Sequence, residues 1–123
     1  MARLLLTVQQ IIPKYPVTPL VADVADFTWT TAGADFADGV RFPMQGREII
    51  LIRNDNGGAQ TVTVESVVDP YARTTDITTY SVGIGEYAIF SALAISGWRQ
   101  TNGEMWLTAS AADVFFAILR LPV

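Results

Sequence analysis

The C-terminal residues 113–121 form a run that is apolar on both sides of an extended strand. Alternate side chains of a strand point to opposite sides of its sheet, and here both sets are apolar: Val114, Phe116 and Ile118 against Phe115, Ala117, Leu119 and Leu121. Such a strand must be covered on both sides, either inside a sandwich with an extra covering segment or at a subunit contact. Residues 49–52, Ile-Ile-Leu-Ile, have the same two-sided character.

The chain is short for the amount of apolar surface that it carries. It has 123 residues, of which 50% are hydrophobic and 16% are charged. A domain of this size buries about two-thirds of its unfolded surface around one core, which leaves little material to cover the second side of two strands. The composition therefore predicts a partner surface, supplied by an oligomer or by a host structure.

Short strand patterns and turn residues alternate along the chain, and no stretch has the periodicity of an amphipathic helix. The spacing predicts three hairpins: strands 49–52 and 61–65 around 54–58, strands 77–82 and 86–90 around 83–85, and strands 98–100 and 104–109 around 101–103. Eight or nine short strands predict an all-β fold. We expect residues 21–123 to form a single antiparallel β-sandwich or jelly-roll-like domain.

Residues 1–20 are expected to form an extended N-terminal strand and a Pro-rich arm. Pro13, Pro16 and Pro19 recur every third residue. Each proline lacks a backbone donor and favours extended geometry in the residue before it, so this stretch cannot be a central strand. Its apolar content indicates packing, either over the protein's own core or against a neighbouring subunit or capsid surface, and we favour the neighbour.

The arm and the last strand together supply the predicted interface. Its residues are Ile11, Ile12, Pro13, Tyr15, Pro16, Val17, Pro19, Leu20, Phe115 and Leu119.

The absence of histidine and cysteine from the sequence removes most catalytic chemistry. Without imidazole or thiol there is no His general base, no Cys nucleophile, no disulfide and no zinc site of the usual ligand types. The pairs Asp23/Asp26 and Asp35/Asp38 are more typical of turns and caps than of metal or glycosidase sites. We expect no enzymatic activity, no cofactor and no metal.

The charge pattern argues against nucleic acid and membrane partners. The net charge is −4 and the eight basic residues form no cluster, whereas phosphate binding requires a local excess of Lys and Arg. No apolar run approaches the length of a membrane span, and the N-terminal run of residues 4–8 is too short for a secretion signal. The protein is expected to be soluble.

The aromatic residues allow a second interpretation. Trp29, Trp98 and Trp106, together with Tyr71, Tyr80 and Tyr87, could form a stacking platform for sugars. Trp98 and Trp106 are expected to face each other across the third hairpin. Cross-strand aromatic pairs also stabilise sheets without binding anything, so both readings stay open. The alternative function is a carbohydrate- or ligand-binding β-sandwich module.

Four segments carry a family resemblance: residues 49–70 (IILIRNDNGGAQTVTVESVVDP), Gly85-Glu86, Gly97-Trp98-Arg99-Gln100 and residues 113–121. Together they resemble the head decoration, or capsid cement, proteins of tailed bacteriophages. The resemblance covers the C-terminal part of the chain, and the Pro-rich N-terminal third has no matching motif. It implies a β-sandwich or β-tulip fold with no active site.

The resemblance also implies a location and partners. Such proteins assemble, often as trimers, on the exterior of the capsid and lock its capsomers together. We therefore expect a virion structural protein, assembled in the host cytoplasm, whose partners are the major capsid protein and further copies of itself.

Overall fold

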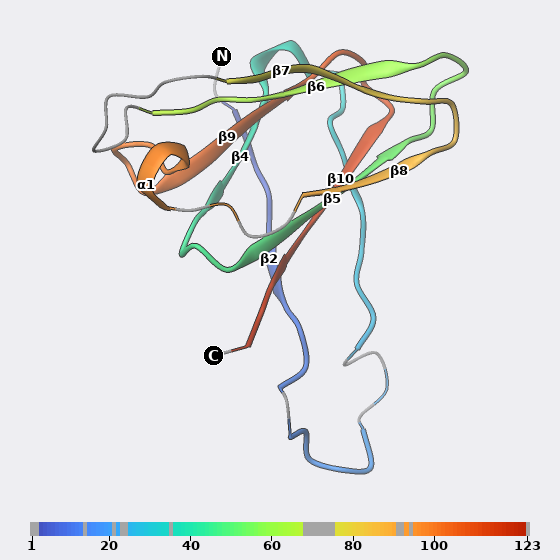
Figure 1. The fold of residues 1–123 in the computed structure, drawn as a ribbon. Coiled ribbons are helices and arrows are strands. Elements are labelled where there is room, and N and C mark those ends of the chain that lie inside the picture. The colour runs from blue at the N-terminus through green and yellow to red at the C-terminus, as the bar shows by residue number, and fades with distance from the viewer. Residues whose placement is uncertain are drawn as a thin grey trace.

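The computed structural model describes residues 3–13, 15–20, 22, 25–34, 36–67, 76–90, 93 and 95–122. Ten strands dominate these residues (Figure 1). The elements are β1 (Leu4–Leu5), β2 (Val8–Gln10), β3 (Thr30–Thr31), the 3-10 turn η1 (Phe36–Asp38), β4 (Val40–Pro43), β5 (Glu48–Asn54), β6 (Gln60–Val64), β7 (Ile77–Val82), β8 (Tyr87–Phe90), the single-turn helix α1 (Ile95–Trp98), β9 (Glu104–Ala109) and β10 (Val114–Arg120).

The strands form two mixed sheets that enclose one core. Sheet 1 has the order β1-β4-β9-β6-β7, and sheet 2 has the order β2-β10-β5-β8, with β3 beside β10. The short strands β1 and β2 pair in parallel with β4 and β10, and the other pairs are antiparallel. The all-β prediction is confirmed, while the expectation of purely antiparallel sheets is wrong because the N-terminal residues enter both sheets in parallel.

The core lies between the facing sides of the two sheets. Alternate residues of each long strand point inward. The largest fully buried side chains come from both sheets: Phe42, Val62, Val64, Met105 and Leu107 from sheet 1, and Ile50, Ile52, Val114, Phe116 and Ile118 from sheet 2. Tyr80 of β7 and Phe90 of β8 meet edge to face, with ring centroids 5.6 Å apart, and close the side of the sandwich where these edge strands lie.

The three predicted hairpins are wrong, because consecutive strands cross from one sheet to the other. Strand β5 belongs to sheet 2 and β6 to sheet 1, and likewise β7 belongs to sheet 1 and β8 to sheet 2. In the third case, residues 98–100 form no strand: Trp98 ends α1, and Gln100 donates one backbone hydrogen bond to Glu104. A period of two specifies which side chains face the core. It does not specify whether two consecutive strands pair in one sheet or lie in the two opposing sheets.

Asn54 joins the two sheet-crossing turns. This side chain is fully buried. Its amide nitrogen donates to the carbonyl oxygens of Gly58 and Val82 at 3.0 and 2.8 Å, and its amide oxygen accepts from the backbone N–H of Asn56 at 2.9 Å. The backbone of Asn54 also bonds the turn after β7, through Glu86 and Gly85. Every polar atom of this buried amide is satisfied, so the turn after β5 and the turn after β7 are held together at one point.

A buried ion pair fastens the other end of β5 to β10. Arg120 Nε lies 2.6 Å from Glu48 Oε2, and the two side chains are only 12% and 2% exposed. Burial alone would raise the pKa of Glu48, but the hydrogen bonds from Arg120 and from the backbone N–H groups of Gln45 and Gly46 outweigh it and lower the pKa below its usual value of 4.5. The ionised carboxylate is therefore the form that the fold stabilises.

Replacing Glu48 with Gln should make stability less dependent on pH. A carboxyl group whose pKa is depressed in the folded state adds stability above its unfolded pKa, and that stability disappears as the pH falls through the folded value. We expect E48Q to lower the free energy of unfolding by about 2 kcal/mol at pH 7, and the difference from the wild type to shrink progressively as the pH falls below 4.5, the usual pKa of the carboxyl group. Urea unfolding between pH 3 and 7 measures this.

Glu65→Gln is the matched control, because Glu65 pairs with Arg3 at a surface where its side chain is 34% exposed. It should change stability by less than about 1 kcal/mol. An E48Q difference that stays constant down to pH 3 would contradict the assignment of a depressed pKa.

Candidate interaction surface

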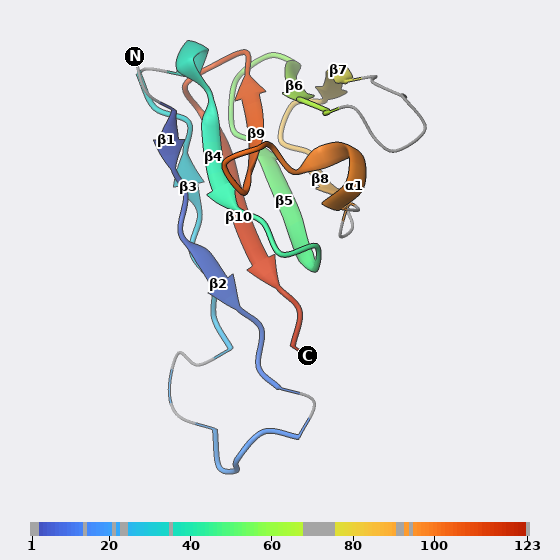
Figure 2. The ribbon, with the colours of Figure 1, turned by 90° about the vertical axis from the view of Figure 1, so that its left-hand side faces the viewer.

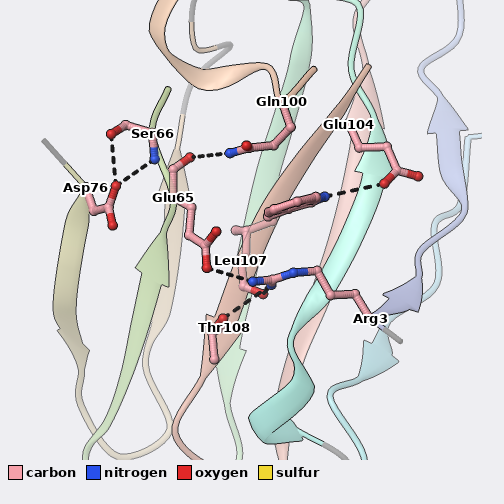
Figure 3. Close-up of polar contacts among 9 residues, drawn as sticks. Arg3, Glu65, Ser66, Asp76, Gln100, Glu104, Leu107 and Thr108 are labelled. Carbon is pink, nitrogen blue, oxygen red and sulfur yellow. Dashed lines mark hydrogen bonds and ion pairs between the residues drawn. The ribbon is translucent and has the colours of Figure 1, made fainter. Parts of the chain in front are cut away.

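The outer face of sheet 1 carries charged groups that are paired, while the edge strand β1 exposes Leu4 and Leu5. Arg3 lies across β9, where its guanidinium is 2.6 Å from Glu65 Oε1 and donates to the Leu107 carbonyl oxygen at 2.9 Å (Figure 3). The same guanidinium stacks on Trp106, with its Cζ atom 5.0 Å from the ring centroid. The polar groups of this face already have partners within the chain.

A second ion pair on this face joins Arg41 of β4 to Glu104 of β9. Burial favours a raised pKa for Glu104, but hydrogen bonds from Arg41, Trp106 and Asn102 lower it overall, so the carboxylate remains ionised.

The outer face of sheet 2 is apolar. Adjacent strands place Leu51 between Ile89 and Ala117, and Ile49 beside Leu119. Toward β8 this face is open to solvent: Ile89 is 64% exposed and its neighbour Tyr87 is 67% exposed. The second side of the two-faced strands is thus only partly covered by the described residues of this chain.

Trp29 supplies the partial cover. Its ring lies 5.9 Å from the Tyr87 ring and 5.5 Å from the Phe27 ring, centroid to centroid. Residues 30 and 31 pair with β10 as β3, so the indole reaches from that edge across β10 and β5 toward β8. Ala117 of β10, on the same face, is buried.

Arg53 stands at the centre of this face. Its Cζ atom lies 4.2 Å from the Phe115 ring centroid and 5.3 Å from that of Trp29. Within the described part of the chain, no carboxylate pairs with Arg53, and its buried Nε has no hydrogen-bond partner. Two aromatic contacts hold the guanidinium in place, and because Nε is buried, only the terminal amino groups of Arg53 can reach a group outside the chain.

Residues 11–28, which we call the proline loop, leave the sandwich where β2 ends and return at β3. In two views at right angles, the loop extends past the end of the sandwich at which β10 terminates (Figures 1 and 2). Gln9 closes its base: the side-chain oxygen accepts from Thr28 N–H and the side-chain nitrogen donates to Thr28 O, both at 2.9 Å.

The predicted interface residues fall into separate groups. Near the base of the loop, Ile11, Ile12 and Leu119 line an apolar hollow of about 190 Å³ together with Phe27. Further out, Tyr15 and Val17 are 85% and 88% exposed and Leu20 is 47% exposed; Pro13 and Pro19 are exposed, and Pro16 is half-buried. Phe115 lies apart from this group, under Arg53. The loop therefore presents apolar side chains to solvent instead of folding them over its own core.

The predicted aromatic platform included Trp29 and Tyr87, which the structure brings together, but sequence reasoning missed Arg53 beside them. The available signal was Arg53, a charged residue that interrupts the apolar run of β5 on its outward side. The expected pairing of Trp98 with Trp106 is wrong: Trp98 packs against the core, and Trp106 lies on the outer face beside Arg3. Tyr71, Asp23 and Asp35 lie outside the described residues.

Other hollows offer little chemistry. A shallow hollow of about 410 Å³ beside α1 is lined by Ile95, Arg99, Gln100, Thr101, Asn102 and Gly103, of which only Arg99 is charged. The described residues contain no group of three carboxylates placed to hold a metal ion. In the same part of the chain, no helix has the length and apolar content needed to cross a bilayer.

Comparisons of the chain with protein-family models, with curated proteins and with solved structures found no match.

Arg53 should contribute little to the stability of the isolated protein. Replacing Arg53 with Met removes two cation–π contacts, each of which stabilises the fold by about 0.5–1 kcal/mol. It also removes a buried donor without a partner, which destabilises the fold by a similar amount, so the two effects offset each other. We expect R53M to change the free energy of unfolding by less than about 1 kcal/mol.

Arg120→Met is the comparison, since it leaves the buried carboxylate of Glu48 unpaired. It should lower stability by about 3–5 kcal/mol. Urea unfolding at pH 7 measures both variants, and a loss as large in R53M as in R120M would show that Arg53 serves the fold itself.

Proposed function

We propose that this chain is a non-enzymatic virion structural protein that binds the outer surface of a bacteriophage capsid and stabilises the capsid lattice as a homotrimer. The contrast between the two outer faces carries the proposal. Sheet 1 presents paired polar groups, whereas sheet 2 presents Tyr87 and Ile89 to solvent beside the unpaired Arg53. A contiguous exposed apolar face is typical of a protein that docks onto another macromolecule.

The residue types on this face support a protein partner. Trp, Tyr and Arg are the residues that most often dominate the binding energy of protein interfaces, and Trp29, Tyr87 and Arg53 are direct neighbours here. Rigid aromatic rings and a stacked guanidinium lose little conformational freedom when a partner covers them. The exposed apolar side chains of the proline loop add a second surface of the same kind.

A capsid suits such a partner-seeking domain, because decoration requires buried area and no catalysis. A standard specific interface buries roughly 1,600 Å² in total, and linked copies bind a repeating lattice more tightly through their effective concentration. The resemblance of residues 49–70 and 113–121 to capsid decoration proteins supports the major capsid protein as the partner and the capsid exterior as the location. A jelly-roll-like or β-tulip classification belongs to the same proposal, and the strands that switch sheets support it.

A second candidate function is a carbohydrate- or ligand-binding module of a phage tail, fibre or other virion part. The cluster of Phe27, Trp29 and Tyr87 favours it, because exposed aromatic rings can stack on sugars. Titration with a glycan panel while tryptophan fluorescence is recorded separates the two functions. Saturable quenching that R53M or Tyr87→Ala weakens would favour the glycan-binding module, and an unchanged signal favours the structural role.

Cosedimentation with capsids of the encoding phage tests the decoration proposal. We expect the protein to pellet with expanded capsids that lack it, to saturate at a fixed ratio to the major capsid protein, and to raise the temperature at which those capsids rupture. The physical reason is that each bound copy adds buried interface between capsomers. Protein that stays in the supernatant at every ratio, with no change in rupture temperature, would refute the decoration role.

A further inference from the structure

We propose that the open half of the sheet 2 outer face is the docking site for the proline loop of a second copy of this chain. The inference rests on the self-association included in the proposed function, and it does not require binding to a capsid. Each copy carries one uncovered apolar face, at Tyr87 and Ile89, and one loop with uncovered apolar side chains, at Val17 and Leu20.

The receiving surface lies on the β8 side of sheet 2, where Trp29 touches the Tyr87 ring but the Tyr87 and Ile89 side chains stay 67% and 64% exposed. Ile89 and Tyr87 form its outer rim on β8, with Leu51 and Arg53 beside them on β5. Arg53 is already held between aromatic rings, so it can donate to the backbone carbonyls of a docked segment without first being ordered. Prolines leave neighbouring carbonyls without regular partners, which makes an extended Pro-rich segment a suitable acceptor.

The loop of the same chain is not positioned to cover this surface. The Gln9–Thr28 hydrogen bonds hold its base at the edge strand β2, while β8 is the opposite edge of sheet 2. Three strand spacings, about 14 Å, separate the two edges, and the loop extends past the end of the sandwich (Figure 2). We therefore infer that the loop of a second copy of the chain covers this surface.

The loop of a neighbouring copy is long enough to do so. Residues 10–27 lie between Gln9 and Thr28, whose hydrogen bonds close the base of the loop. The tip can therefore reach about nine residues, or roughly 30 Å, from the base. Sheet 2 is about 15–20 Å wide at 4.8 Å per strand. A neighbour's loop can therefore cross from β8 toward Trp29.

The mode of docking is side chain on face, not strand addition at an edge. Pairing with an edge strand uses the N–H groups of alternate residues. Pro13 and Pro19 interrupt one alternate set and Pro16 interrupts the other, so neither side of the loop has a continuous row of donors. Apolar contacts between Val17, Leu20 and the Tyr87–Ile89 surface are the remaining means of binding.

Loop-to-face docking joins two different surfaces, so it is a heterologous contact. Repeated contacts of this kind close into a ring when the rotation between copies allows it. In a ring of three, every copy both gives a loop and receives one, so no apolar face or loop is left over. This is how the proposed trimer would satisfy both surfaces.

Two variants break the contact from opposite sides. The first replaces residues 13–25 with Gly-Ser-Gly and keeps the Gln9–Thr28 clip. The second is Ile89→Lys, whose matched control is Ile84→Lys, because Ile84 is 66% exposed in the turn before β8 and lies off the face. By sedimentation velocity, we expect each contact variant to weaken self-association at least about tenfold, and I84K to assemble like the wild type.

Mixing the two variants is the decisive step. The loop-shortened protein retains an intact face, and I89K retains an intact loop, so an equimolar mixture should form a 1:1 dimer that neither variant forms alone. Val17→Lys, with Thr18→Lys as its control, replaces the shortened protein if circular dichroism shows that the latter is unfolded. Wild-type assembly by the loop variant, a wild-type monomer at all concentrations, or no complex in the mixture would overturn the proposal.

The outcome is separable from that of the proposed function. Complementation in the mixture together with failure to cosediment with capsids would keep the docking site and remove the decoration role. Capsid binding by a chain that never self-associates would keep the decoration role and remove the docking site.

Discussion

Strand β10 is apolar on both sides. One side is buried in the core, and the other forms part of the outer face of sheet 2. Its inward side chains Phe116 and Ile118 complete the core. Its outward side chains, with those of β5, make an outer face that a single sandwich has no second layer to bury. Trp29 reaches the Tyr87 ring on this face and still leaves the Tyr87 and Ile89 side chains of β8 largely exposed. The proposed partner surface therefore follows from the composition of one strand.

The outer faces of the two sheets differ in how their arginine side chains are paired. On sheet 1, Arg3 and Arg41 are each paired with a carboxylate, at Glu65 and Glu104, so that face gains little by leaving water. Arg53 has aromatic contacts and no carboxylate among the described residues. Among the described residues, the outer face of sheet 2 thus differs from that of sheet 1 in carrying an arginine that is held by aromatic rings and not by a carboxylate.

Much of the fold class could be predicted from sequence, whereas its topology could not. Strand patterns identified the segments that became β5, β6, β7, β8, β9 and β10, and the two-sided apolar runs belong to β5 and β10, which lie inside sheet 2. The hairpins failed because alternation does not tell adjacent strands from opposing ones. The decisive contact is Asn54, whose buried amide bonds residues on two separate turns. The place of Arg53 beside Trp29 and Tyr87 was missed for a similar reason: three distant segments meet only after the sheet has formed.

The chain contains no cysteine, so the central claim, that another copy covers the β8 half of sheet 2, can be measured with one introduced thiol. Ile89→Cys reports on the face, and Ile84→Cys reports on an equally exposed site outside it. The account predicts that alkylation of the thiol at position 89 slows as protein concentration rises, while alkylation at position 84 keeps a constant rate. Equal rates at both positions across all concentrations would contradict it.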